Sequence, residues 1–278
     1  MYERDGRFVR AWPEGLFSER AHGITAAPDG SIWCVDDADH SVRKFTPDGE
    51  VLRTLGTRGV PSATGYDGTA IATIHRAGPP FNRPTNLAVA PTGDLYVTDG
   101  YGNARVHQFA PSGTLIRSWG APGTGPGEFR LPHGIAILPD GRVLVADREN
   151  DRIQIFDLAG AFVGEWLDVQ RPTHLAVGPD GLVYVTELPW LRGQRSLRFG
   201  DVVADRYGRV TALTDDGEAV ARWGGRPMGT PGAFTAPHGI AVDSRGDVYV
   251  AEVTYTIGVA PGLIAPGGAP TLQKLARR

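Results

Sequence analysis

Residues 131–147 read Leu-Pro-His-Gly-Ile-Ala-Ile-Leu-Pro-Asp-Gly-Arg-Val-Leu-Val-Ala-Asp. Two short runs rich in aliphatic and β-branched residues surround a Pro-Asp-Gly turn, and this pattern is typical of a β-hairpin. Similar stretches occur four more times, at residues 20–36, 83–99, 171–187 and 236–252. A hairpin that recurs five times in one chain indicates a repeat architecture.

Most copies of the hairpin are followed by two further β-rich runs. Arg152-Ile-Gln-Ile-Phe156 is an example of the third run, and Leu115-Ile-Arg-Ser-Trp119 is an example of the fourth. Four antiparallel strands in a repeat of about 40 to 65 residues are the signature of a β-propeller blade. We therefore predict an all-β chain that forms one propeller domain over residues 1–278, with blades that start near residues 22, 85, 133, 173 and 238.

The composition excludes several classes of protein. The 278 residues include 38 Gly and 22 Pro, but 41% are hydrophobic, which is enough for a large core and argues against disorder. The formal charge of −3 lacks the basic footprint of a nucleic-acid binder. Cys34 is the single cysteine and cannot form an internal disulfide. No long apolar run or signal-peptide pattern is present, so we expect a cytoplasmic protein without a membrane partner.

One position near the start of each hairpin alternates between two residue types. Aligned copies carry, in chain order, His22, Thr85, His133, Thr173 and His238. In a six-bladed ring, alternate blades lie about 120° apart, so three imidazoles would meet at the axis. Three neutral imidazoles with an open fourth position form the ligand set of a catalytic zinc site. The alternative is that Pro-His-Gly is merely a turn at the start of a strand. His174 is one residue out of register, and we interpret it as structural.

The ends of the chain bear on the number of blades. Residues 1–12 have the pattern of the end of a strand, a turn and a further strand, and residues 271–276 give the fifth blade a third strand. We predict a six-bladed propeller whose sixth blade is incomplete at the N-terminus. In the alternative, residues 7–12 close the fifth blade directly and the ring has five blades.

The repeats resemble NHL-type propeller blades, and residues 20–252 as a whole resemble the peptidyl-α-hydroxyglycine α-amidating lyases. Residues 84–156 carry most of the resemblance, with Asp99-Gly-Tyr-Gly-Asn-Ala-Arg105 and Ala146-Asp-Arg-Glu-Asn-Asp-Arg-Ile-Gln154. The resemblance implies a metal-dependent enzyme that cleaves the C–N bond of an α-hydroxyglycine compound to an amide and glyoxylate. It also implies zinc ligands at His22, His133 and His238, a catalytic tyrosine at Tyr101 and an active-site arginine at Arg148.

Elementary chemistry agrees with these roles, because a nearby cation or metal favours the phenolate of Tyr101 and makes it a usable base. Arg148 would bind a carboxylate or act electrostatically on Tyr101. The alternative is that both residues belong to an ordinary turn into the third strand of a blade.

The sequence departs from the lyase pattern at several positions. Gly239 stands where the family has an acidic calcium ligand, Gly102 replaces a disulfide cysteine, and the family's second essential arginine has no counterpart. We therefore expect zinc or another divalent transition metal rather than calcium, and a small-molecule or peptide substrate. Two other functions remain open: a non-enzymatic NHL propeller that binds a protein or peptide, and a lactonase-like hydrolase with an oxygen-rich calcium site.

Overall fold

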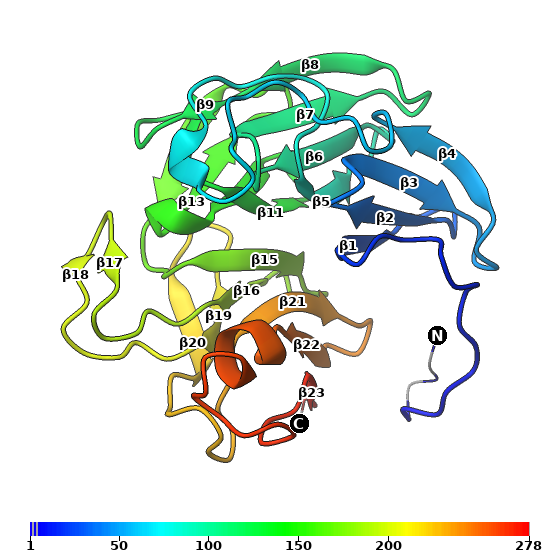
Figure 1. The fold of residues 1–278 in the computed structure, drawn as a ribbon. Helices are drawn as coiled ribbons and strands as arrows, with labels where there is room; N and C mark the ends of the chain where they lie inside the picture. Colours follow the sequence, from blue (N-terminus) through cyan, green and yellow to red (C-terminus); the bar gives the residue numbers. More distant parts are fainter. Residues whose placement is uncertain (2, 4, 278) are drawn as a thin grey trace.

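A computed structural model describes residues 1–278 except residues 2, 4 and 278. Five small antiparallel sheets follow one another around an axis, as in a five-bladed propeller (Figure 1). Blade 1 contains β1 (Ala21–Ala26), β2 (Ile32–Asp36), β3 (Ser41–Phe45) and β4 (Val51–Leu55). Blade 2 contains β5 (Pro84–Val89), β6 (Leu95–Asp99), β7 (Arg105–Phe109) and β8 (Leu115–Trp119). Blade 3 contains β11 (Pro132–Ile137), β12 (Val143–Asp147), β13 (Arg152–Phe156) and β14 (Phe162–Trp166).

The last two blades vary this plan. Blade 4 contains β15 (Pro172–Val177), β16 (Val183–Glu187), β19 (Arg209–Leu213) and β20 (Ala219–Gly224). Blade 5 has three strands, β21 (Pro237–Val242), β22 (Val248–Glu252) and β23 (Leu272–Leu275). Two short strand pairs, β9 (Ala121–Pro122) with β10 (Glu128–Phe129) and β17 (Arg195–Ser196) with β18 (Gly200–Asp201), lie in loops. Short helical turns span Ile71–Thr73, Arg148–Asn150 and Tyr255–Val259, and no helix among the described residues is long and apolar enough to cross a membrane.

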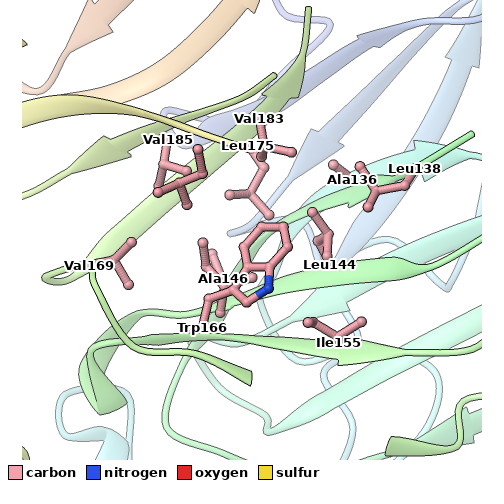
Figure 2. Close-up of a cluster of buried hydrophobic side chains, with 12 residues drawn as sticks. Ala136, Leu138, Leu144, Ala146, Ile155, Trp166, Val169, Leu175, Val183 and Val185 are labelled. Atoms are coloured by element: carbon pink, nitrogen blue, oxygen red, sulfur yellow. The ribbon is translucent and has the colours of Figure 1, made fainter. Parts of the chain in front are cut away.

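The hydrophobic core lies between consecutive blades, and the sheets of blades 2, 3 and 4 are covered on both faces. Between blades 3 and 4, Leu144 and Trp166 pack with Leu175 and Val185, all of them at most 6% exposed (Figure 2). Similar clusters lie between the other consecutive blades. This arrangement explains why both faces of the inner strands are apolar.

An acidic residue at the end of the second strand anchors every blade. Each carboxylate accepts a hydrogen bond from a backbone N–H 17 or 18 residues earlier, at distances from 2.6 to 2.9 Å. The bond ties the loop that precedes the first strand to the end of the second strand. The five acidic residues are Asp36, Asp99, Asp147, Glu187 and Glu252.

The described residues form five blades, which is the alternative of the two predicted arrangements, and no sixth blade is found among them. Residues 7–12 do not join the sheet of blade 5. The end of this segment contacts blade 1 instead, where the indole Nε1 of Trp12 donates to the carbonyl of Pro47 at 3.0 Å and the Trp12 ring contacts Phe45. The aromatic contact with Phe45 therefore holds Trp12 against blade 1, although we expected this segment to complete another blade.

The series of blades is open between blade 5 and blade 1. Consecutive inner strands pack against each other from β1 to β21, but β21 and β1 do not pack in this way within the described part of the chain. Ile24 of β1 is accordingly 65% exposed, whereas the residues at the same position of the other four blades are 2 to 6% exposed. A cavity lined by residues of β1, β21 and β22 lies at this opening.

Candidate functional site

The three histidines that share one register position lie together at the axis. His22, His133 and His238 are the second residues of β1, β11 and β21, and one ring nitrogen from each lies within 4.8 Å of the other two. The ring centroids are 4.8 Å apart for His22 and His133, 5.0 Å for His22 and His238, and 4.6 Å for His133 and His238. Their role as metal ligands stays a prediction.

Backbone carbonyls of the neighbouring blades orient two of these imidazoles. The Nδ1 atom of His22 lies 2.6 Å from the carbonyl oxygen of Thr85, and Nδ1 of His133 lies 2.7 Å from that of Thr173. A carbonyl can only accept, so both Nδ1 atoms carry the proton and both Nε2 atoms present a lone pair. This is the tautomer that binds a metal through Nε2.

The threonines at the same position of blades 2 and 4 connect these blades to blades 3 and 5. The hydroxyl of Thr85 lies 2.9 Å from the carbonyl oxygen of Pro132, and that of Thr173 lies 3.1 Å from the carbonyl oxygen of Pro237. In blades 1 to 4 this position therefore bonds to the first or second residue of the next inner strand, through an imidazole or through a hydroxyl. Sequence reasoning missed this role of the threonines, although their alternation with histidine was visible.

Burial keeps the three imidazoles neutral. It lowers the pKa of His22 to about 4, although the hydrogen bond to Thr85 opposes the change. Burial also lowers the pKa of His133 and of His238 well below the usual value, and the neighbouring histidines and Arg148 act in the same direction. Each histidine therefore offers a free lone pair at neutral pH.

Tyr101 lies against the three histidines. Its hydroxyl oxygen is 3.1 Å from Nε2 of His22 and 3.0 Å from Nε2 of His133. Both nitrogens are acceptors, and one hydroxyl has only one proton to donate. A cation shared by the imidazoles would remove this deficit, so the donor set fits a metal that prefers nitrogen ligands.

One equivalent position from every blade forms the floor of a cavity above the histidines. The residues that follow the acid at the end of the second strand are Asp37, Tyr101, Arg148, Leu188 and Val253, and the backbone N–H of each donates to the residue just before the first strand. All five line a cavity of about 430 Å3, together with His22 and His238. In blade 2 an additional residue, Gly100, precedes this position, and a Cβ atom there would lie only 2.1 Å from the carbonyl oxygen of Pro132. Tyr101 therefore reaches the histidines on a loop that requires glycine.

Arg148 lies beside Tyr101 and is held by a carboxylate. Its guanidinium carbon is 5.5 Å from the centre of the Tyr101 ring, and its Nε donates to Glu149 at 2.8 Å. Burial opposes the charge of Arg148, but Glu149 and Tyr101 outweigh it and raise the pKa of Arg148 above its usual value. Burial likewise opposes the charge of Glu149, yet Arg148 and Arg171 hold the pKa of Glu149 below its usual value. The site therefore contains a buried, permanently charged arginine next to the tyrosine.

His174, which is out of register, and Gly239, which departs from the lyase pattern, lie close to each other beside the third histidine. His174 lies outside the group of three, and its Nδ1 accepts a hydrogen bond from the backbone N–H of Ile240 at 3.3 Å. Gly239 is open, since the nearest atom to a Cβ there is 3.5 Å away. His174 thus connects blades 4 and 5, in line with the structural interpretation.

Sequence reasoning missed a second group of charges in the cavity. Arg20 donates through Nε to both oxygens of Asp37, at 2.8 and 2.9 Å, and Arg83 contacts the same carboxylate at 3.0 Å. Asp37 is fully buried, and the guanidinium carbon of Arg20 is 5.5 Å from the Tyr101 ring centre. Because 17 and 46 residues separate Asp37 from these partners, local sequence patterns could not have indicated the group.

Comparisons with known proteins agree with the propeller fold. The NHL repeat model matches residues 81–109, 129–156 and 234–256. NHL repeat-containing protein 3 of Homo sapiens is 34% identical over 194 residues, which cover 65% of this chain and 52% of that protein. Peptidyl-alpha-hydroxyglycine alpha-amidating lyase 1 of Drosophila melanogaster is 29% identical over 274 residues, 89% of this chain and 45% of that protein. The chain thus spans about half the length of these curated relatives.

A solved structure of a streptogramin B lyase has the same fold. Its TM-score is 0.57 at 18% identity, with 86% of this chain and 64% of that chain covered. An identity this low bears on the fold alone. The matched repeats, the five sheets and the relatives together establish that the chain is an NHL-repeat β-propeller that resembles the peptidyl-α-hydroxyglycine α-amidating lyases.

Proposed function

We propose that this propeller is a metal-dependent lyase that cleaves the C–N bond of an α-hydroxyglycine compound, with an amide and glyoxylate as products. One observation carries the proposal: the Tyr101 hydroxyl lies 3.1 and 3.0 Å from two imidazole nitrogens that both present lone pairs. This geometry brings a potential base and a potential metal site to the same point in space.

His22, His133 and His238 would hold the metal, and the nitrogen-only donor set favours Zn2+ over calcium. When bound, such an ion would supply a Lewis acid for the hydroxyl oxygen of the substrate. The backbone carbonyls of Thr85 and Thr173 fix two of the ligands before any metal arrives.

Tyr101, in its ionised form, would take the proton of the substrate's hydroxyl group. The C=O bond of glyoxylate then forms as the C–N bond breaks, and the electron pair of that bond leaves with the amide nitrogen. The proton taken by Tyr101 passes to this nitrogen, so the substrate divides into amide and glyoxylate with no further reactant. Arg148, whose guanidinium carbon lies 5.5 Å from the Tyr101 ring centre, would act electrostatically on Tyr101.

The comparisons support this reaction and one rival. The Drosophila relative is named as an amidating lyase and aligns with 89% of the chain. The human relative is named only for its NHL repeats, which keeps a non-enzymatic propeller that binds a protein or peptide as the second candidate. A lactonase-like hydrolase would need an oxygen-rich site, whereas the group of possible ligands found among the described residues consists of three imidazoles.

Metal analysis and turnover test the proposal together. Wild-type protein, His133→Ala and His75→Ala would be supplemented with zinc and assayed for bound metal, and His75 is an exposed histidine outside the site. We expect about one zinc per chain in the wild type and in His75→Ala, and loss of zinc in His133→Ala.

Release of glyoxylate from N-acetyl-α-hydroxyglycine would then be measured for the wild type and Tyr101→Phe. The proposal requires turnover in the wild type and a loss of at least about 100-fold in Tyr101→Phe. Tight zinc binding with no difference between these two proteins would support the non-enzymatic propeller. Absence of bound transition metal in the wild type would refute the lyase.

A further inference from the structure

The charges around Tyr101 form two groups of the same design. Asp37 is shared by Arg20 and Arg83, and Glu149 is shared by Arg148 and Arg171, with the closest N–O distances between 2.8 and 3.0 Å. Each group has two guanidinium ions and one carboxylate, and Glu19 also lines the cavity, so four guanidinium ions stand against three carboxylates and one positive charge is in excess. The cavity therefore favours an anionic ligand.

The two groups differ in how far they are open to the cavity. The side chain of Arg20 is 48% exposed, whereas that of Arg148 is 11% exposed and is paired with Glu149. Arg83 contacts Asp37 but does not line the cavity, and Arg171 has its guanidinium carbon 4.5 Å from the ring centre of Trp190. Arg20 is thus the guanidinium that a ligand can reach most easily.

Asp37 holds Arg20 in a fixed position without using all of its donors. The carboxylate, which is completely buried, binds Nε and Nη2 of Arg20, so Nη1 remains for another acceptor. Arg20 also lies two residues before His22 and has its guanidinium carbon 5.5 Å from the Tyr101 ring centre. A carboxylate bound to Arg20 would therefore lie next to both the tyrosine and the histidines.

We infer that Arg20, oriented by Asp37, is the binding residue for the carboxylate of the substrate. The inference rests on the proposed function for the identity of the substrate, and it assigns the free carboxylate of an α-hydroxyglycine compound to the open side of the cavity. Arg148 then acts on Tyr101 rather than on the substrate's carboxylate. Compounds in which this carboxylate is replaced by a neutral amide are poor ligands.

The test measures binding with unreactive probes, so that it does not depend on turnover. Calorimetry would compare N-acetylglycine with N-acetylglycinamide on the zinc-supplemented full-length chain, for the wild type, Arg20→Gln, Arg20→Lys and Arg58→Gln. Arg58 is the matched control, because it pairs with Asp39 at 2.7 Å and is 58% exposed, but does not line the cavity. Arg20→Gln leaves Asp37 paired with Arg83, so the buried carboxylate keeps a cation and the fold is preserved.

We expect the wild type and Arg58→Gln to bind N-acetylglycine more tightly than N-acetylglycinamide. Arg20→Gln should lose about 10- to 100-fold in affinity for N-acetylglycine and show unchanged affinity for N-acetylglycinamide. Arg20→Lys should recover part of the preference, because it restores the charge but not the two-pronged geometry. Equal affinity of Arg20→Gln and wild type for N-acetylglycine would overturn the inference, and so would a wild type without preference. If the preference depends on Arg20 but no glyoxylate is released from the hydroxylated substrate, the binding role stands and the lyase function fails.

Discussion

Gly134 and Gly239 allow a direct test of how the histidines are held in place. Each glycine follows a histidine of the site on an inner strand, but the two differ in what surrounds them. A Cβ atom at Gly134 would lie 2.5 Å from the carbonyl oxygen of Thr173 and 2.8 Å from the Cα of His174, both in the backbone of β15. At Gly239 the nearest atom, the Cβ of Ala251, is 3.5 Å away.

The substitution Gly134→Ala forces β11 and β15 apart. Ordinary contact starts at 3.4 Å, so β15 must move by about 0.9 Å. That shift would lengthen the bond from His133 Nδ1 to the Thr173 carbonyl from 2.7 Å to about 3.6 Å, beyond hydrogen-bonding distance. Overpacking costs about 1 to 3 kcal/mol and a lost hydrogen bond about 1 kcal/mol, so we expect a loss of about 2 to 4 kcal/mol in the free energy of unfolding.

Thermal unfolding of the metal-free proteins, followed by circular dichroism, measures this effect without reference to the proposed metal. The Tm of Gly134→Ala should fall by about 5 to 10 °C, whereas Gly239→Ala should change by less than about 2 °C because its methyl group has room. Competition with a chromophoric chelator should also show zinc affinity about 10- to 100-fold weaker in Gly134→Ala, since His133 loses the Thr173 carbonyl that orients its ring. Equal stability of the two variants would refute the close approach of β11 and β15.

Four further predictions rest on burial and hydrogen bonding. Burial lowers the pKa of His22 to about 4 and the pKa of His133 and His238 well below the usual value. Zinc affinity, measured by chelator competition, should therefore change less than about twofold between pH 7.5 and 6. Three imidazoles with the ordinary pKa would lose about 50-fold in zinc affinity over the same range. In the metal-free protein the buried histidines stay neutral, whereas the histidines of the unfolded chain take up protons below a pKa of about 6.5. The free energy of unfolding should therefore fall as the pH decreases from about 6.5 toward 4. A free energy from urea unfolding that does not change over this range would contradict the burial of the histidines. Burial raises the pKa of Cys34 to about 11, so a thiol reagent at pH 8 should modify this cysteine only after denaturation. Rapid modification of the native protein would show that Cys34 is accessible. Thr173→Val keeps the shape of the side chain but removes the hydroxyl that lies near the Pro237 carbonyl. Urea titrations should show a free energy of unfolding that is lower by about 1 to 3 kcal/mol. An unchanged free energy would exclude a contribution from the Thr173 hydroxyl.

Local sequence patterns predicted the parts of the structure that depend on short-range signals. The Pro-Asp-Gly turns and alternating runs place the first strand of each blade, and these strands begin at residues 21, 84, 132, 172 and 237. The common register of His22, His133 and His238 also follows from the repeat, because equivalent residues of equivalent strands point in the same direction. Their close approach needed no information beyond the alignment of the copies.

Long-range contacts were beyond such patterns. The pair of Arg20 and Asp37 joins residues on either side of a hairpin, and Arg83 reaches the same carboxylate from the next blade. The N-terminal residues resembled part of a blade, yet the contact of Trp12 with Phe45 holds them beside blade 1. Alternation of polar and apolar residues specifies that a segment is extended, but not which sheet it joins.

The convergence of the histidines does not require a closed ring. Our argument from alternation assumed six blades, whereas the described chain has five blades with an opening between blade 5 and blade 1. The angle between neighbouring blades is set by the pairwise packing of their inner strands, and this packing is continuous from β1 to β21. Alternate blades therefore bring their histidines together whether or not the ring is complete.

The opening between blade 5 and blade 1 gives a metal bound at the histidines a structural role. His22 and His238 lie on the two blades that border the opening, and His133 lies on the middle blade. An ion bound to all three would connect the first and last blades across the axis, where their inner strands lack direct packing. Ligands that bind only the folded state stabilise it in proportion to the logarithm of their concentration above Kd. The gain in Tm on addition of zinc should therefore disappear in His22→Ala and in His238→Ala, because each removes the connection at one edge of the opening.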